Sequence, residues 1–165
     1  MQSARRFGCV LVVLMLCCMF PLTSAQLPTA PGVEIDCADK NPELDVHPLN
    51  DPTVEITCTV SNPSSFQETI SVEKEWDGLE VEMMLEDDSF ELGPGEEEDF
   101  IVTFTGQKRM SSDLSYDFTL TAIVTNVGML DWPEALATNA SVSGDLNIAT
   151  SAWLTSTSPT KAPGR

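Results

Sequence analysis

Basic residues are scarce in this chain of 165 residues, in which 8 Lys and Arg stand against 26 Asp and Glu. All of the acidic residues lie after residue 25, whereas Arg5 and Arg6 lie before it. Without those two arginines, six basic residues face 26 acidic ones, which gives a net charge of −20. Such a chain repels nucleic-acid phosphates and anionic lipid headgroups. We therefore expect a soluble, acidic protein that attracts cations and has no nucleic-acid partner.

Residue types that commonly catalyse reactions are also sparse. His47 is the only histidine, and it lies in the loop-like segment DVHPLND (45–51). A Ser–His–Asp arrangement would have to use it, and the sequence contains no Gly-x-Ser-x-Gly elbow, phosphate loop or dinucleotide fingerprint. Carboxylates are abundant, but an acidic surface brings carboxylates together without any catalytic purpose. The sequence therefore predicts a protein that is not an enzyme and needs no cofactor.

Long apolar runs are absent after residue 25. The run FGCVLVVLMLCCMFPL (7–22) follows the two arginines, and Thr23-Ser24-Ala25 then supplies small residues where a signal peptidase cuts. This arrangement predicts a signal peptide over residues 1–25. An uncleaved N-terminal anchor is the alternative, although the run is shorter than the roughly 20 residues of a bilayer span. We expect no membrane span after cleavage.

Two of the five cysteines, Cys37 and Cys58, remain after residue 25. Export places them in an oxidising compartment, where an even pair indicates a disulfide. Structural zinc would need more ligands than two cysteines and one histidine at no recognisable spacing. We expect a Cys37–Cys58 disulfide in a protein that is secreted or held at the cell surface.

Apolar and polar residues alternate repeatedly after residue 25, which is the pattern of half-buried strands. Such alternation predicts strands over 32–37, 53–60, 68–76, 79–85, 90–92, 100–104 and 114–126, with weaker strands over 140–148. Both cysteines fall on apolar faces, where a disulfide that crosses the core would lie. Leu79 is expected to point inward with the other apolar residues of its strand.

Turn residues separate these short strands, and no long segment has helical periodicity. About seven to nine strands of this kind predict an all-β, Ig-like antiparallel β-sandwich over residues 26–150. Residues 151–165 are rich in Ser, Thr and Pro and are expected to form a linker or tail.

Four short motifs follow one another between CTVSNPSS (58–65) and TLTAIVTN (119–126). They are a strand that ends in an Asn-containing turn, a Gly-Leu-Glu-Val segment (78–81), a Pro-Gly turn (92–96) and a strand that opens near Tyr116. Together they resemble the Ig-like repeats of prokaryotic cell-surface proteins, of the cell-adhesion-related (CARDB) and α-galactosidase-associated type. The resemblance implies extracellular adhesion, spacing or a role accessory to carbohydrate-active enzymes. It supplies no catalytic residues, and the cysteine pair is not part of the family pattern.

Acidic residues crowd both sides of Gly93-Pro94-Gly95. A hairpin at this turn would bring the two groups together, and calcium prefers several carboxylate oxygens from such loops. The spacing of an EF-hand and the aspartate repeats of calcium β-rolls are both absent. A solvated charge run is therefore the ordinary interpretation. The alternative is a weak calcium site at Asp87, Asp88, Glu97 and Glu98.

Three tryptophans are candidates for stacking on sugar rings. Trp76 follows the inward register of its strand, which predicts a core position. Trp132 and Trp153 lie in less regular segments and are the better candidates for an exposed platform, with packing as the alternative role. Asn139-Ala140-Ser141 is the only N-glycosylation sequon, because Pro63 follows Asn62.

These features predict a non-catalytic secreted or cell-surface module for adhesion, spacing or partner binding. Its partner would be an extracellular protein or glycan. The alternative function is that of an accessory carbohydrate-binding domain in an extracellular enzyme system.

Cleavage of the signal peptide has a direct test. Because small residues precede Gln26, intact-mass analysis of the secreted protein should place its N-terminus within a residue or two of Gln26. A secreted product that still carries Arg5 and Arg6 would contradict the prediction.

Overall fold

The computed structural model describes residues 30–133, 136 and 138–150. The predicted signal peptide (1–25) and the predicted tail (151–165) therefore lie outside the described residues. The described part of the chain contains no α-helix. Its ten strands are β1 (Glu34–Cys37), β2 (Glu43–Asp45), β3 (Thr53–Ser61), β4 (Glu68–Trp76), β5 (Glu82–Leu85), β6 (Ser89–Leu92), β7 (Glu97–Thr105), β8 (Ser115–Val127), β9 (Leu130–Asp131) and β10 (Asn139–Ala149).

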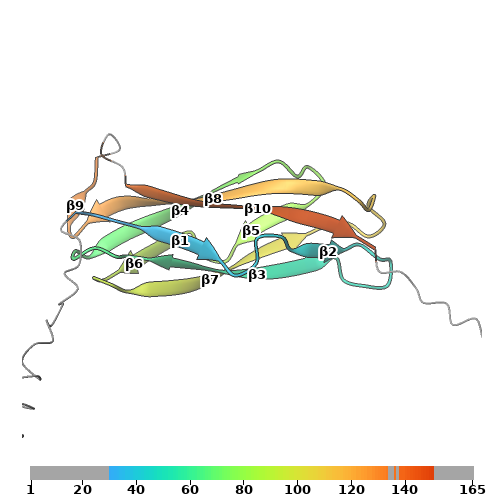
Figure 1. Cartoon of the computed structure of the whole chain (residues 1–165), viewed down its shortest axis with the longest axis horizontal. Coiled ribbons are helices and arrows are strands. Elements are labelled where there is room, and N and C mark those ends of the chain that lie inside the picture. Colours follow the sequence, from blue (N-terminus) through green and yellow to red (C-terminus); the bar gives the residue numbers. More distant parts are fainter. Residues whose placement is uncertain (1–29, 134–135, 137, 151–165) are drawn as a thin grey trace, which may run out of the picture.

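The strands form two sheets that face each other (Figure 1). One sheet has four strands in the order β1-β3-β7-β5, and the other has the order β2-β10-β8-β4-β6 with β9 paired to β8. This arrangement confirms the all-β, Ig-like sandwich. Ten strands exceed the seven to nine expected, because β2 and β9 are too short to show alternation. One pairing also departs from the expected antiparallel pattern, since β2 runs parallel to β10.

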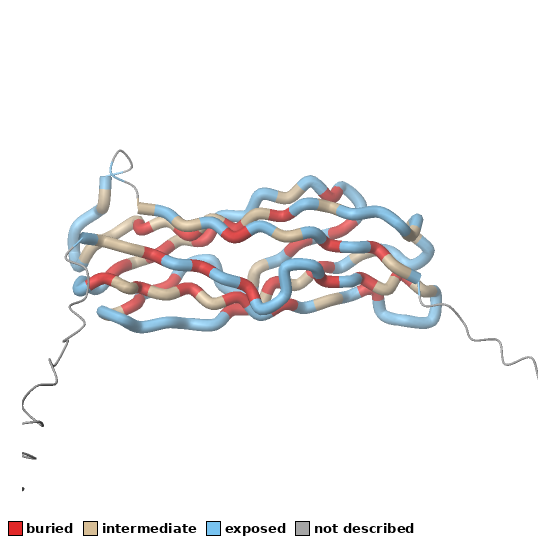
Figure 2. The backbone as a smooth tube through the Cα atoms, in the orientation of Figure 1, coloured by how far each residue is buried: buried red, intermediate tan, exposed pale blue. Residues whose placement is uncertain are grey.

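Alternating burial along the strands builds the core (Figure 2). Phe104 in one sheet packs against Phe118 in the other with ring centroids 5.3 Å apart, and Trp76 lies 5.4 Å from Phe104. Tilted aromatic pairs at this separation bury large apolar areas and hold the sheets together. The core position predicted for Trp76 agrees with its packing against the buried cluster.

The inward position expected for Leu79 is wrong, because this side chain is 99% exposed. Residues 77–81 form a bend rather than a strand, and β5 begins only at Glu82. The Trp76 indole donates its N–H to the carbonyl oxygen of Val81 at 2.9 Å, so the bend folds over the tryptophan. Gly78 lies so close to that ring that a Cβ atom there would approach it to 2.2 Å.

Two segments that change sheets close the sides of the sandwich. Within residues 34–45, β1 pairs with β3 in one sheet and β2 pairs with β10 in the other. Within residues 82–92, β5 pairs with β7 and β6 pairs with β4. Lys74 lies on the same side of β4 as the buried Val72, and its ammonium group donates to the Met83 carbonyl across the second closed side. An inward charge of this kind also discourages pairing with another chain.

Gly144 allows the first sheet-changing segment to approach β10 closely. The Asp145 N–H donates to the Lys40 carbonyl at 2.8 Å, and the Asn147 N–H donates to the Pro42 carbonyl at 2.9 Å. A Cβ atom at residue 144 would lie 2.3 Å from the Lys40 oxygen and 2.6 Å from the Phe118 ring. Only glycine permits such a close backbone approach.

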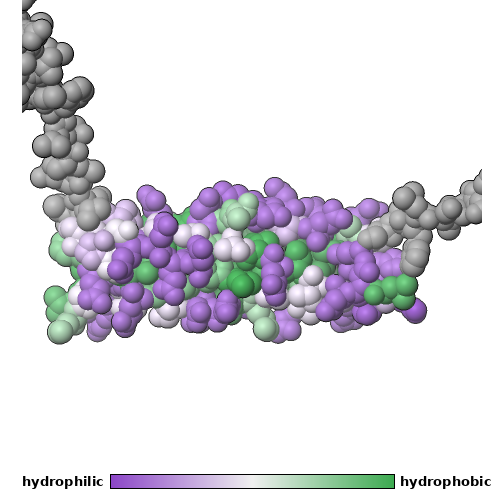
Figure 3. All heavy atoms as spheres, turned by 90° about the horizontal axis from the view of Figure 1, so that it is seen from below, coloured by the Kyte–Doolittle hydropathy of each residue, from purple (hydrophilic) through white to green (hydrophobic). Residues whose placement is uncertain are grey.

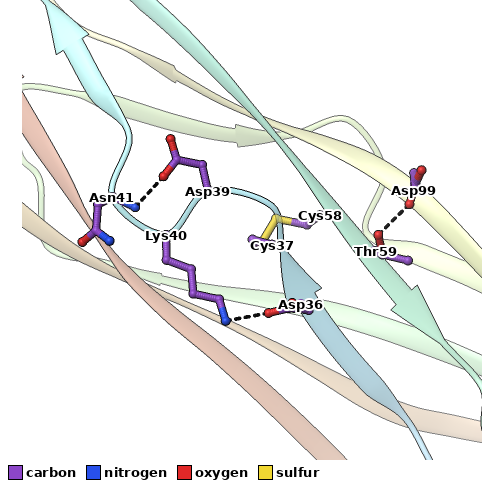
Figure 4. Close-up of a disulfide and its surroundings, with 8 residues drawn as sticks. All are labelled: Asp36, Cys37, Asp39, Lys40, Asn41, Cys58, Thr59 and Asp99. Carbon is purple, nitrogen blue, oxygen red and sulfur yellow. Dashed lines mark hydrogen bonds and ion pairs between the residues drawn. A yellow bond between two sulfur atoms is a disulfide. The ribbon is translucent and has the colours of Figure 1, made fainter.

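Cys37 and Cys58 form the predicted disulfide (Figure 4). The two residues are directly opposite each other on β1 and β3, with Cα atoms 4.0 Å apart. The bond therefore joins neighbouring strands of one sheet instead of crossing the core between sheets. It lies at the last residue of β1, where the chain leaves the four-stranded sheet.

Replacing both cysteines with alanine should destabilise the fold by roughly 3 kcal/mol, since the cross-link closes a loop in the unfolded chain. Thermal denaturation of the Cys37→Ala/Cys58→Ala protein measures this loss as a lower Tm. The native secreted protein should also have no titratable thiol. Two titratable thiols would show that the cross-link does not form. An unchanged Tm would show that it does not stabilise the fold.

Candidate functional site

The turn at Gly93-Pro94-Gly95 connects two sheets. The expected hairpin is wrong, because β6 pairs with β4 whereas β7 pairs with β3 and β5. The Glu96 carboxylate folds back and accepts from the Gly93 N–H at 2.7 Å. Asn62 fixes the same turn with two groups. Its side-chain amide donates to the Leu92 carbonyl at 3.0 Å, and its backbone carbonyl accepts from the Gly95 N–H at 2.8 Å.

The four residues of the candidate calcium site lie on different elements. Asp87 and Asp88 occupy the change of sheet between β5 and β6, and the Asp88 carbonyl accepts from the Val72 N–H at 2.8 Å. Glu97 and Glu98 begin β7, opposite residues of β3. Within the described ranges, no group of three or more His, Cys, Asp or Glu is arranged to hold a metal ion. Calcium binding at these residues stays a prediction.

A carboxylate pair that the sequence analysis missed lies on the solvent face of the larger sheet. Asp117 on β8 and Asp145 on β10 are directly opposite each other. A hydrogen bond to Asp145, repulsion from its charge and slight desolvation raise the pKa of Asp117. The next two rows are neutral hydroxyl pairs, Thr119 with Ser143 and Thr121 with Ser141, each with oxygens 2.9 Å apart. Open hollows of about 380 and 350 Å³ flank Asp117, so the pair is accessible from solvent.

Glu68 is a second residue that the sequence analysis did not select. It is only 1% exposed and lies on the same side of β4 as Ile70, although it is acidic. Its Oε1 accepts from the Ser64 hydroxyl at 2.5 Å and from the Gly32 N–H at 3.2 Å. Its Oε2 has no hydrogen-bond partner among the residues that the structure describes. Glu68 thereby ties the segment before β1 to the loop before β4.

The surface is largely hydrophilic on the face that Figure 3 shows, with apolar side chains in small separate groups. Lys40 and Asp36 form the one ion pair of the described residues, at 2.7 Å. The acidic groups of the described residues therefore mostly form no ion pair with a described basic side chain. No helix in the described part of the chain is long and apolar enough to cross a membrane.

Comparisons with known proteins show the type of fold. No protein-family model matches the chain, and no curated protein matches its sequence. The seventh PapD-like (ASH) domain of human CEP192 superposes with a TM-score of 0.51 at 12% identity, over 79% of this chain and 94% of that domain. Activated α-2-macroglobulin from Escherichia coli gives 0.50 at 13% identity, over 72% of this chain and 9% of that one. The fold is immunoglobulin-like. Identities this low show the fold alone, and the CARDB-type resemblance is not confirmed.

The remaining predicted site residues that the structure describes take ordinary places in this Ig-like sandwich. Trp132 is half-buried against the core, and its indole donates to the Leu136 carbonyl at 2.9 Å. Trp153 lies outside the described residues. Asn139 is exposed at the start of β10, so its sequon is accessible. His47 takes part in a turn, where its Nδ1 accepts from the Leu49 N–H at 3.2 Å.

Replacing Asp117 with Asn should stabilise the protein at neutral pH. Because the pKa of Asp117 is raised in the folded state, its ionisation opposes folding as pH rises through that pKa, and the penalty is absent below the unfolded pKa of about 3.9. Asp117→Asn should therefore have a higher Tm than the parent at pH 7 and the same Tm near pH 3. Asp87→Asn removes one charge from the same acidic protein and serves as the control. Equal gains from the two substitutions would leave general charge repulsion as the explanation.

Proposed function

We propose that this chain is a non-catalytic secreted or cell-surface module that holds other parts apart or presents them, or that binds an extracellular partner. The observation that supports this most is where the chain enters and leaves the sandwich. The segment that leads into β1 and the segment that follows β10 lie at opposite ends of the long axis (Figure 1).

Hydrogen bonds fix the chain at both ends. Near the entry, the Gly32 N–H donates to Glu68, which is opposite Val127 at the end of β8. Near the exit, the Val46 N–H donates to the Ala149 carbonyl at 2.9 Å, and the Arg109 N–H donates to the Val46 carbonyl at 3.0 Å. β8 spans most of this distance with 13 residues, or about 40 Å of extended strand. A rigid body attached at its two ends suits a spacer.

Other features support an extracellular location and a non-catalytic role. The Cys37–Cys58 disulfide suits an oxidising compartment. The candidate carboxylate pair lies on an open sheet face without a histidine beside it, unlike the enclosed sites in which catalytic groups work. The accessory carbohydrate-binding function is less favoured, because Trp132 is half-buried and its indole N–H is already bonded.

The spacer proposal is tested by fusing a small folded domain to each end of the mature chain and measuring their separation by small-angle scattering. The two domains should stay apart by at least the length of β8, about 40 Å. Fused domains that lie side by side would contradict a spacing role. The matched control joins the same two domains by a flexible linker with as many residues as the module.

The non-catalytic part of the proposal is tested with purified mature protein on glycoside, ester and peptide substrates. We expect no turnover. Turnover that survives purification and disappears in a folded Asp117→Asn or Asp145→Asn protein would overturn it.

A further inference from the structure

One stretch of β10 has backbone groups that pair with no neighbouring strand. The Val124 N–H donates to the Thr138 carbonyl, and the Ile148 N–H donates to the Leu114 carbonyl. The backbone N–H and C=O groups of even-numbered residues in this segment therefore point toward β8. The N–H groups of Asp145 and Asn147 point the other way, toward the segment before β2. Because alternate residues direct their backbone to opposite sides, the outward set continues at Asn139, Ser141 and Ser143. Among the described residues, nothing pairs with the backbone of these three on that side.

The other sheet edges carry features that discourage pairing with another chain. β1, β5 and β6 have four residues each, and all three carry exposed acidic side chains. The part of β4 beyond β6 carries Glu73, Lys74 and Glu75. The stretch Asn139–Ser143 has no charge, no proline and no irregularity in its register with β8. An edge without such protection is a ready template for an added strand.

The surroundings of this edge favour a basic partner. A hollow of about 440 Å³ is lined by Ala140 of β10 and Ile35 of β1, and by the acidic residues Glu34, Asp36 and Glu97. Lys40 pairs with Asp36, whereas Glu34 and Glu97 have no ion-pair partner among the described residues. A second copy of this chain would bring the same acidic surface and be repelled. A segment with Lys or Arg side chains would be attracted.

We propose that the outer edge of β10 from Asn139 to Ser143 binds an extended, basic segment of a partner protein as an additional strand. The partner's backbone pairs with Asn139, Ser141 and Ser143, and its basic side chains reach Glu34 and Glu97. Main-chain hydrogen bonds supply affinity in this mode, and the side chains supply selectivity. The inference deepens the proposed function by naming the class of partner for the module.

The sequon at Asn139 makes this edge subject to control by glycosylation. A glycan on Asn139 would cover the first of the three outward residues. Protein from a host that lacks N-glycosylation is therefore the material for the test, and the glycosylated form should bind more weakly.

The probe is a synthetic peptide of four Lys-Val repeats, and its binding to the mature protein is measured by calorimetry. Backbone amide exchange should slow at Asn139, Ser141 and Ser143 when the peptide binds. Ser141→Pro removes an N–H that faces away from β8 and so leaves the ladder with β8 intact. It should weaken binding about tenfold or more, whereas Ser141→Ala, which keeps the N–H, should bind like the parent. Glu34→Gln/Glu97→Gln should weaken binding and reduce its dependence on salt.

Several results would overturn the inference. The first is that Ser141→Pro binds the Lys-Val peptide as tightly as the parent protein does. The second is that a peptide N-methylated at alternate residues, or a Glu-Val peptide, binds the parent as tightly as the Lys-Val peptide does. The third is that the free protein dimerises through this edge. If Ser141→Pro fails to fold, the N-methylated peptide decides the question with the unchanged protein. If the Lys-Val peptide does not bind, but the domains fused to the two ends of the module stay apart, this inference is refuted and the spacing role is retained.

Discussion

Closure of the two sides of the sandwich by segments that change sheets is the constraint on which the rest of this structure depends. Each segment pairs first with one sheet and then with the other, so both sheets are tied together along their open sides. The aromatic contact between Phe104 and Phe118 lies between these two ties. The disulfide reinforces the first tie at its switching point, because Cys37 is the last residue before the chain leaves its sheet. Gly144 leaves room for the same segment to lie close against β10.

The same arrangement explains which surface remains available. β1 belongs to the four-stranded sheet and β2 pairs with only the last residues of β10, so no described strand pairs with the stretch from Asn139 to Ser143 on its outer side. On the second closed side, Lys74 reaches the Met83 carbonyl and places a charge at the edge. The two sides therefore differ in one respect that matters for binding. One is blocked by charge, and the other presents a short, regular and neutral edge beside acidic groups.

Much of the fold could be predicted from the sequence because alternation fixes which residues face inward. The long strands β3, β4, β7 and β8 were predicted in this way, whereas the pairing of Cys37 with Cys58 was predicted from their even number in an exported chain. Alternation does not say which sheet a strand joins. That is why the turn at 93–95 was expected to close a hairpin, and why the disulfide was expected to cross the core. Leu79 was misplaced for a related reason, since an apolar residue in a bend over Trp76 continues the pattern without belonging to the strand.

The candidate sites were harder to predict than the fold. Asp117 and Asp145 are 28 residues apart, and only the register between β8 and β10 brings them together. The acidic residues near the 93–95 turn show the reverse case. They are close in sequence, but the strands on the two sides of the turn belong to different sheets. The free edge of β10 also depends on where β1 and β2 pair, which the composition of β10 does not show.

The closing role of the sheet-changing segments is tested most directly by native-state amide hydrogen exchange of the mature protein. If residues 34–45 and 82–92 tie the sheets together, their protected amides should exchange only when the whole domain unfolds, at the same free energy as those of β3 and β8. Exchange of either segment at a much lower free energy, while β3 and β8 stay protected, would contradict this account. The sandwich would then be held by its central strands alone.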